Sequence, residues 1–120
     1  MPFEKLLIWQ KAIELVDLIY DITISFPKEE LFGLTSQMRR AAVSIPANIA
    51  EGSQRSSQKD FAHFIQISKG SLAELRTEAY IARRRKLLST EQWNMFVTRA
   101  QELDKMMRAF YLTLAKKVPV

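Results

Sequence analysis

The sequence has no cysteine, one histidine, three glycines and four prolines among its 120 residues. Without cysteine there is no disulfide, no thiolate nucleophile and no Cys-based metal site. The scarcity of glycine and proline excludes a loop-rich scaffold, and a composition of 48% hydrophobic and 26% charged residues excludes disorder. A chain of this size buries roughly two-thirds of its unfolded surface. We therefore expect a single packed domain over residues 1–120.

Long hydrophobic runs are also missing. The longest stretch without a charge, residues 41–50, contains Ser44, Pro46 and Asn48, whereas a membrane-spanning helix needs about 18 or more apolar residues. The charged residues Glu4 and Lys5 leave no room for the apolar core of a signal peptide. These features predict a cytoplasmic protein without a membrane segment.

Apolar residues recur at spacings of three and four in four segments, a pattern typical of amphipathic helices. The first segment runs from Leu7 to Ser25 and ends at Phe26-Pro27, and the second runs from about Leu34 to Glu51. The third follows a predicted N-cap at Ser57 and reaches about Lys86. The fourth opens with the capping box Ser89-Thr90-Glu91-Gln92 and stops before Pro119.

Four such helices joined by short connectors predict an all-α fold, an antiparallel up-down-up-down four-helix bundle with left-handed packing. In the first helix Trp9, Ala12, Val16 and Ile19 supply one apolar seam. A second seam of Leu15, Leu18 and Ile22 makes the apolar surface wider than one isolated bundle requires. We expect this second seam to face another subunit in a homo-oligomer.

Two residues within the predicted helices break the usual preferences, and a third marks a helix end. Pro46 lies inside the second helix, where it removes a backbone hydrogen bond, and it predicts a bend there. Gly52 suits the cap just past the end of that helix. Gly70 costs the third helix about 1 kcal/mol relative to alanine, so we expect close packing at that point.

Catalytic patterns are weak, and we expect neither an enzyme nor a cofactor or metal site. Asp60-x-x-His63 supplies one half of a di-iron motif, but no second histidine exists to complete it. Arg55 and His63 resemble the Arg and His pair of HEPN ribonucleases, although seven residues separate them, which is too many. Glycine-rich nucleotide-binding loops and the G-x-S-x-G nucleophile pattern do not occur.

Charge is distributed unevenly along the chain. Residues 1–30 hold three Lys and six acidic residues (net −3), and residues 31–120 hold fifteen Lys or Arg and seven acidic residues (net +8). An excess of positive charge of this kind favours binding to a polyanion. Part of this positive charge has an alternative explanation that requires no ligand. Cations in the last turn of a helix complement its dipole, and others form an ordinary solvated surface.

The candidate nucleic-acid contacts are the cations of the second and third helices and of the turn between them. They are Arg39, Arg40, Arg55, Lys59, Lys69, Arg76, Arg83, Arg84, Arg85 and Lys86. Phe61 and Phe64 fall on the predicted core seam, so we expect contacts to phosphates rather than base stacking.

The second helix also carries a recognisable string. Residues 32–52, FGLTSQMRRAAVSIPANIAEG, together with the opening IWQKA of residues 8–12, FPKEE of residues 26–30 and GSLAEL of residues 70–75, resemble the family of proteins encoded in intervening sequences of large-subunit ribosomal RNA genes. The similarity covers nearly the whole chain, although the fourth helix matches only in pattern.

The resemblance implies a four-helix bundle that assembles as a homopentamer. It also implies a relationship to the accessory variability determinant of diversity-generating retroelements, a basic pentamer that binds nucleic acid and a reverse transcriptase. On this basis we expect a non-enzymatic accessory protein that binds nucleic acid, RNA in preference. The alternative is a homo-oligomeric protein-interaction scaffold without nucleic-acid binding.

Overall fold

The computed structural model describes residues 2–116, and within that range every regular element is helical. A short 3-10 turn, η1 (Phe3–Lys5), precedes the first long helix. A 3-10 turn, η2 (Lys28–Glu30), and a π-helical turn, η3 (Leu31–Thr35), join the first two long helices. The four long helices are α1 (Leu7–Thr23), α2 (Ser36–Ser53), α3 (Gln58–Arg84) and α4 (Thr90–Lys116).

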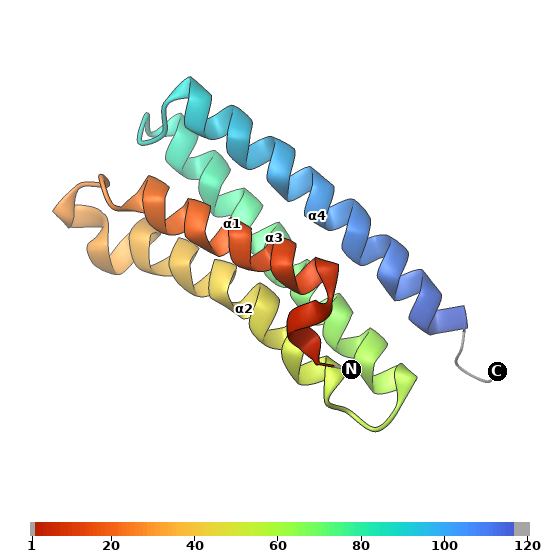
Figure 1. Cartoon of the computed structure of the whole chain (residues 1–120). Coiled ribbons are helices and arrows are strands. Elements are labelled where there is room, and N and C mark those ends of the chain that lie inside the picture. The colour runs from red at the N-terminus through yellow and green to blue at the C-terminus, as the bar shows by residue number, and fades with distance from the viewer. Residues whose placement is uncertain (1, 117–120) are drawn as a thin grey trace.

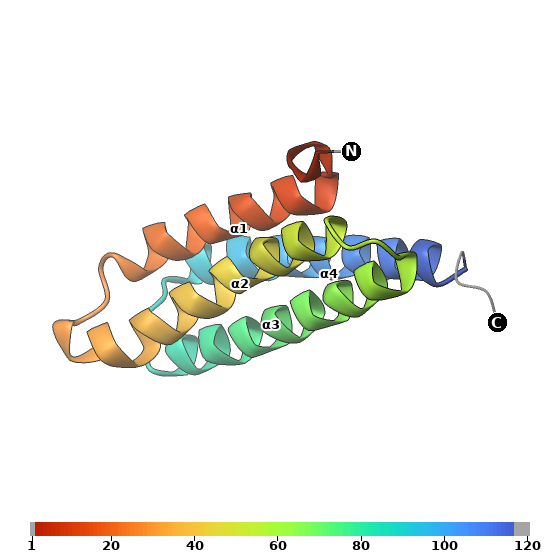
Figure 2. The same ribbon diagram turned by 90° about the horizontal axis from the view of Figure 1, so that it is seen from below.

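The four long helices run alternately up and down along a bundle of 49 × 24 × 23 Å (Figure 1). The α1–α2 and α3–α4 connections lie at one end, and the α2–α3 turn lies at the other end with the N-terminus (Figure 1). Seen from below, α1 and α3 are on opposite sides, with α2 and α4 between them (Figure 2). The predicted antiparallel four-helix bundle is confirmed. None of the helices described is both long and apolar enough to cross a bilayer.

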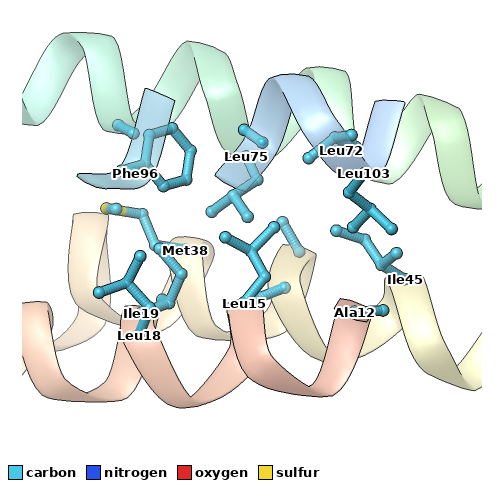
Figure 3. Close-up of a cluster of buried hydrophobic side chains, with 14 of the residues drawn as sticks. Ala12, Leu15, Leu18, Ile19, Met38, Ile45, Leu72, Leu75, Phe96 and Leu103 are labelled. Atoms are coloured by element: carbon cyan, nitrogen blue, oxygen red, sulfur yellow. The ribbon is translucent and has the colours of Figure 1, made fainter. Parts of the chain in front are cut away.

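The core is built from the 3-4 spacing of all four helices. Met38, Ile45 and Ile49 of α2 and Phe96, Leu103 and Met107 of α4 are fully or almost fully buried. Four of these side chains, Met38, Ile45, Phe96 and Leu103, meet α1 and α3 residues in the interior of the bundle (Figure 3). The seams predicted for α2, α3 and α4 are thus largely core, although the aromatic residues Phe61, Phe64, Trp93 and Phe110 are only half-buried.

The seam of α1 assigned to another subunit is instead part of this core, which corrects the prediction. Leu15 is 1% exposed, and Leu18 and Ile22 are also buried. Figure 3 shows Leu15 pointing toward Leu75 of α3 in the interior of the bundle. The physical reason is the period: Ile8, Ala12, Leu15, Ile19 and Ile22 follow a 4-3-4-3 spacing, the seam that a bundle buries. Leu15, Leu18 and Ile22 therefore offer no surface to a second chain.

The helix ends follow the predicted capping chemistry. The Ser57 hydroxyl accepts the backbone N–H of Asp60 at the start of α3. At the start of α4, the Ser89 hydroxyl accepts the backbone N–H of Gln92, and the Gln92 side chain accepts the backbone N–H of Ser89, a complete capping box. The stop predicted before Pro119 lies outside the described residues, which extend to Lys116 of α4.

Two predictions about glycine are wrong. Gly52 lies inside α2 rather than past its end, and an added Cβ would lie 2.6 Å from Cβ of Phe64, so this glycine allows α2 and α3 to touch. At Gly70 an added Cβ would meet nothing within 4 Å, so close packing within the chain does not explain it. Helix α2 continues through Pro46, and the bend predicted there stays a prediction.

Candidate nucleic-acid interface

The ten candidate cations do not form one patch. Arg55 and Lys59 lie at the α2–α3 turn, whereas Arg83–Lys86 lie at the α3–α4 connection, at the other end of the bundle. With a rise of about 1.5 Å per residue, the 25 positions between Lys59 and Arg84 place them roughly 38 Å apart along α3. The half-buried Lys69 and Arg76 lie between them on the flank of α3 that faces α4.

The basic corner, residues Arg83–Lys86, is the densest group. Arg83 is held within the chain: its guanidinium donates to the carbonyl of Leu88 at 2.8 Å and to the hydroxyl of Thr90 at 3.0 Å. Arg84, Arg85 and Lys86 are exposed. The structure thus gives Arg83 a structural role in the connection and leaves the other three side chains at the surface.

The backbone of the basic corner ends α3 in a Schellman motif. The backbone N–H of Leu87 donates to the carbonyl of Ala82, and that of Lys86 donates to the carbonyl of Arg83. Lys86 takes the left-handed position of this motif, with a φ of 64°. Glycine is the usual residue there, and a lysine costs roughly 1 kcal/mol more. Lys86 is therefore a cation at a position where the backbone conformation favours glycine.

Arg39 and Arg40 are neighbours in sequence but point in different directions. Arg39 donates through Nε to the hydroxyl of the buried Thr23 at 2.9 Å, and its guanidinium lies 4.6 Å from the centre of the Tyr20 ring. Arg39 therefore joins α2 to α1. Arg40 is exposed on the outer surface of α2 and is the freer of the two candidates.

The α2–α3 end holds a smaller group of cations. Arg55 pairs with Glu51 at 2.9 Å and lies 4.8 Å from the centre of the Phe64 ring. Lys59 is exposed on the first turn of α3. Lys59 also lines a surface depression of about 350 Å³ between α3 and α4. We call this depression the aromatic hollow; its lining residues are Lys59, Ala62, His63, Gln66, Tyr111 and Ala115.

Tyr111 of the aromatic hollow was missed by the sequence analysis. Its ring packs partly against the core, and the ammonium of Lys69 lies 6.0 Å from the ring centre. The position was hidden in the sequence because Tyr111 follows Phe110, which takes the predicted seam position. An aromatic residue directly after an aromatic core position, as Tyr111 follows Phe110, is the sequence signal that would have indicated this ring.

An exposed apolar group at the α1–α2 connection was also missed. Phe32 is 92% exposed and Ile24 is 79% exposed, with Leu31 and Tyr20 beside them in sequence and also exposed. We call Tyr20, Ile24, Leu31 and Phe32 the apolar corner. The second helix was predicted to begin only at about Leu34, and the exposure of Phe32 before it was not considered; the chain makes two short turns there before α2 begins.

One buried carboxylate has an oxygen atom without a hydrogen-bond partner. Glu78 of α3 is only 7% exposed, and its Oε1 has no hydrogen-bond partner. Burial, followed by the charge of Glu74 and a hydrogen bond with it, raises the pKa of Glu78 from 4.5 to about 7. Glu78 therefore titrates close to neutral pH.

His63 is the residue on which the enzymatic alternatives depended. It is exposed on α3, with its ring 5.9 Å from the ring of Phe64. In the described part of the chain no three His, Cys, Asp or Glu side chains gather as a metal site would require. In the aromatic hollow, His63 lies with the cation Lys59 and the aromatic ring of Tyr111.

Comparison with known proteins agrees with this architecture. The model of a family described as 23S rRNA-intervening sequence protein matches residues 4–109. A crystal structure of a protein of unknown function from the S23 ribosomal protein family of Bacteroides thetaiotaomicron superposes with a TM-score of 0.78 at 22% identity, covering 88% of this chain and 98% of that one. At this identity the likeness concerns the fold. No curated protein matches the chain.

Proposed function

The chain belongs to the family of 23S rRNA-intervening sequence proteins, and from this membership we propose that it is a non-enzymatic, basic bundle that binds nucleic acid, RNA in preference, as an accessory protein. Its role is to hold a phosphate backbone, and any chemistry on the nucleic acid belongs to a partner enzyme. A reverse transcriptase is one such partner by the resemblance to retroelement accessory proteins.

The observation that carries this proposal is the basic corner. Arg84, Arg85 and Lys86 are exposed, contiguous and without an ion pair among the described residues. Two cations would satisfy the dipole at the end of α3, at roughly 0.3 to 1 kcal/mol each. The third, Lys86, occupies a position where glycine is favoured. A phosphate chain gives a reason to keep a cation there.

The basic corner suits phosphates rather than base edges. Its exposed side chains, Arg84, Arg85 and Lys86, are all cations. Contacts between arginine or lysine and phosphates fix position and supply affinity but carry no sequence information. We therefore expect binding that tolerates many sequences and weakens steeply with salt.

The test is the affinity for a structured RNA across a salt series. Wild-type protein should show a linear fall of log affinity with log salt, and the double variant Arg84→Ala/Arg85→Ala should lower that slope by roughly 1 to 2. Lys105→Ala on the exposed surface of α4 is the matched control and should leave the slope within a few tenths of wild type. A wild-type affinity that is absent or independent of salt would refute the proposal.

A homo-oligomeric scaffold is the second candidate, and the apolar corner favours it. Phe32 and Ile24 are large apolar side chains exposed on one connection. Burying them against another protein surface would be favourable, and exposed apolar patches of this kind mark interaction sites. The family resemblance supplies the occupant, other copies of the same chain in a pentamer. This surface replaces the buried seam of α1 as the candidate interface.

Light scattering tests the scaffold. Phe32→Glu should reduce a multi-subunit particle toward the monomer mass of 13.9 kDa. Leu112→Glu, a comparable change at an exposed position of α4, should leave the particle intact. A wild-type protein that is already monomeric at micromolar concentration would exclude this candidate.

A further inference from the structure

The aromatic hollow combines the two kinds of side chain that single-stranded nucleic acids require. Proteins that bind single strands pair a positively charged groove with aromatic rings on which bases stack. Here Lys59 and His63 of α3 face Tyr111 of α4 across one depression of about 350 Å³. That volume is within the range of small-molecule pockets and is sufficient for one nucleotide.

Lys59, which lines the hollow, and Lys69, which lies near the Tyr111 ring, form no ion pair among the described residues. In residues 2–116 the basic side chains that form ion pairs are Lys11, Arg55 and Arg108, so Lys59 and Lys69 form none. The Lys69 ammonium, 6.0 Å from the ring centre of Tyr111, is at the outer limit of a cation–π contact. A phosphate placed beside Lys59 would meet a cation and no carboxylate of the lining.

Tyr111 is held in place before any ligand arrives. Tyr111 packs against the core and also lines the hollow, so little side-chain entropy is lost when a base stacks on its ring. Gln66 lies in the same lining and offers both a donor and an acceptor to the edge of a base. The small residues Ala62 and Ala115 leave the space open.

We infer that the aromatic hollow takes one unpaired nucleotide of a single-stranded nucleic acid, with its base against Tyr111 and its phosphate beside Lys59. This inference rests on the proposed nucleic-acid binding and specifies its ligand as a single strand. A duplex cannot use the hollow, because its bases are stacked within the helix and only its phosphates reach the surface. The hollow therefore adds a preference for single strands to the sequence-tolerant attraction of the basic corner.

The first experiment compares Tyr111→Leu with Tyr80→Leu. Both residues lie on the α3–α4 side of the bundle, but Tyr80 packs near Trp93 and does not line the hollow. Affinities are measured for a single-stranded oligouridine and for an RNA duplex of the same length. Tyr111→Leu should weaken single-strand binding by about tenfold and duplex binding by less than about twofold, and Tyr80→Leu should change neither. Tyr111→Phe, which keeps the ring, should retain wild-type affinity.

The outcomes separate this inference from the proposal on which it rests. If wild-type protein binds both RNAs with a salt-dependent affinity and Tyr111→Leu binds the single strand as tightly as wild type, the inference about the hollow is wrong. The proposed function is then unaffected. Wild-type protein that binds neither RNA overturns both. An equal loss for Tyr80→Leu and Tyr111→Leu likewise overturns the assignment of the hollow.

A second measurement uses the wild-type chain and does not depend on the folding of a variant. Single-stranded RNA containing 5-bromouracil is photocrosslinked to the protein, and the attached peptides are mapped. Attachment at Tyr111 supports the inference. Attachment confined to the basic corner overturns it.

Discussion

At the scale of single residues, the two glycines of the helices make opposite predictions. Gly52→Ala would bring a Cβ to 2.6 Å from Cβ of Phe64 and 3.0 Å from Cδ1 of Phe61. Because a Cβ cannot swing aside, α2 and α3 would have to separate, and we expect a loss of roughly 1 to 3 kcal/mol in the free energy of unfolding. Urea denaturation measures this loss.

Gly70→Ala is the matched control for that substitution. Its Cβ would meet nothing within 4 Å, so the gain in helix propensity, about 1 kcal/mol, should appear as higher stability. If Gly70→Ala destabilised the chain while Gly52→Ala did not, the packing of α2 against α3 described above would be wrong.

Glu78 makes a prediction about pH. Its pKa is raised from 4.5 to about 7 in the folded chain, so between these values the folded state holds a proton that the unfolded state has released. The stabilisation is fully present below about pH 4.5 and is lost as pH rises through about 7. At 1.36 kcal/mol per pKa unit, the free energy of unfolding should fall by about 1 to 3 kcal/mol across this window.

Glu78→Gln removes the titrating group and should abolish that fall. The measurement is the difference in the free energy of unfolding between wild type and variant at pH 4.5, 6 and 8, because the difference cancels the titration of the other carboxylates. Glu74→Gln, which removes the neighbouring charge, should keep a weaker pH dependence. A difference that does not change with pH would contradict the assignment of the raised pKa to burial of Glu78.

How well single residues could be predicted from sequence depended on whether their role is local. The caps at Ser57 and Ser89 were predicted correctly because they depend on residues within one turn. Gly52 and Gly70 were not, because tertiary packing decides whether another helix approaches a glycine: α3 approaches Gly52, and nothing approaches Gly70. The same holds for Leu15, whose place in the core depends on which of two apolar seams the other helices cover.

At the scale of elements, the α3–α4 connection divides the basic corner into a structural and a surface part. Arg83→Ala would remove two hydrogen bonds, to the Leu88 carbonyl and the Thr90 hydroxyl. We expect it to lower the free energy of unfolding by about 1 to 2 kcal/mol, whereas Arg84→Ala should change it by less than about 0.5 kcal/mol. Thermal or urea unfolding of the two variants checks this difference. Equal stability of both variants would show that the Arg83 contacts contribute nothing.

Element boundaries could be predicted where one signal dominates and not where two compete. The 3-4 spacing of α4 and its capping box agree with each other, and the predicted start of α4 is correct. Between α1 and α2 the apolar Leu31, Phe32 and Leu34 continue a helical pattern, yet Pro27 and Gly33 interrupt the backbone. Because of this competition, the exposure of Phe32 was not predicted. The apolar corner was not predicted either.

At the scale of the whole molecule, charge is separated across the bundle. The exposed acidic residues Glu14, Asp17 and Asp21 lie on α1, and α1 is opposite α3 (Figure 2). Helix α3 carries or adjoins most of the candidate cations, including Lys59 and Arg84. A polyanion is therefore expected to approach from the α3 side.

The separation across the bundle leads to a salt-dependent prediction. The bundle is about 23 Å across, which is several times the Debye length of roughly 8 Å at 0.15 M ionic strength and less than the roughly 30 Å at 0.01 M. Asp17→Asn/Asp21→Asn should therefore raise the association rate with RNA about two- to fivefold at 0.01 M and leave it unchanged at 0.15 M. Arg84→Ala/Arg85→Ala, which changes the net charge by the same magnitude in the opposite direction and beside the RNA, should lower affinity at both ionic strengths. Stopped-flow association measures the rates. A rate gain for the aspartate variant that persists at 0.15 M would mean that the RNA also contacts α1, and the expected approach from the α3 side would be wrong.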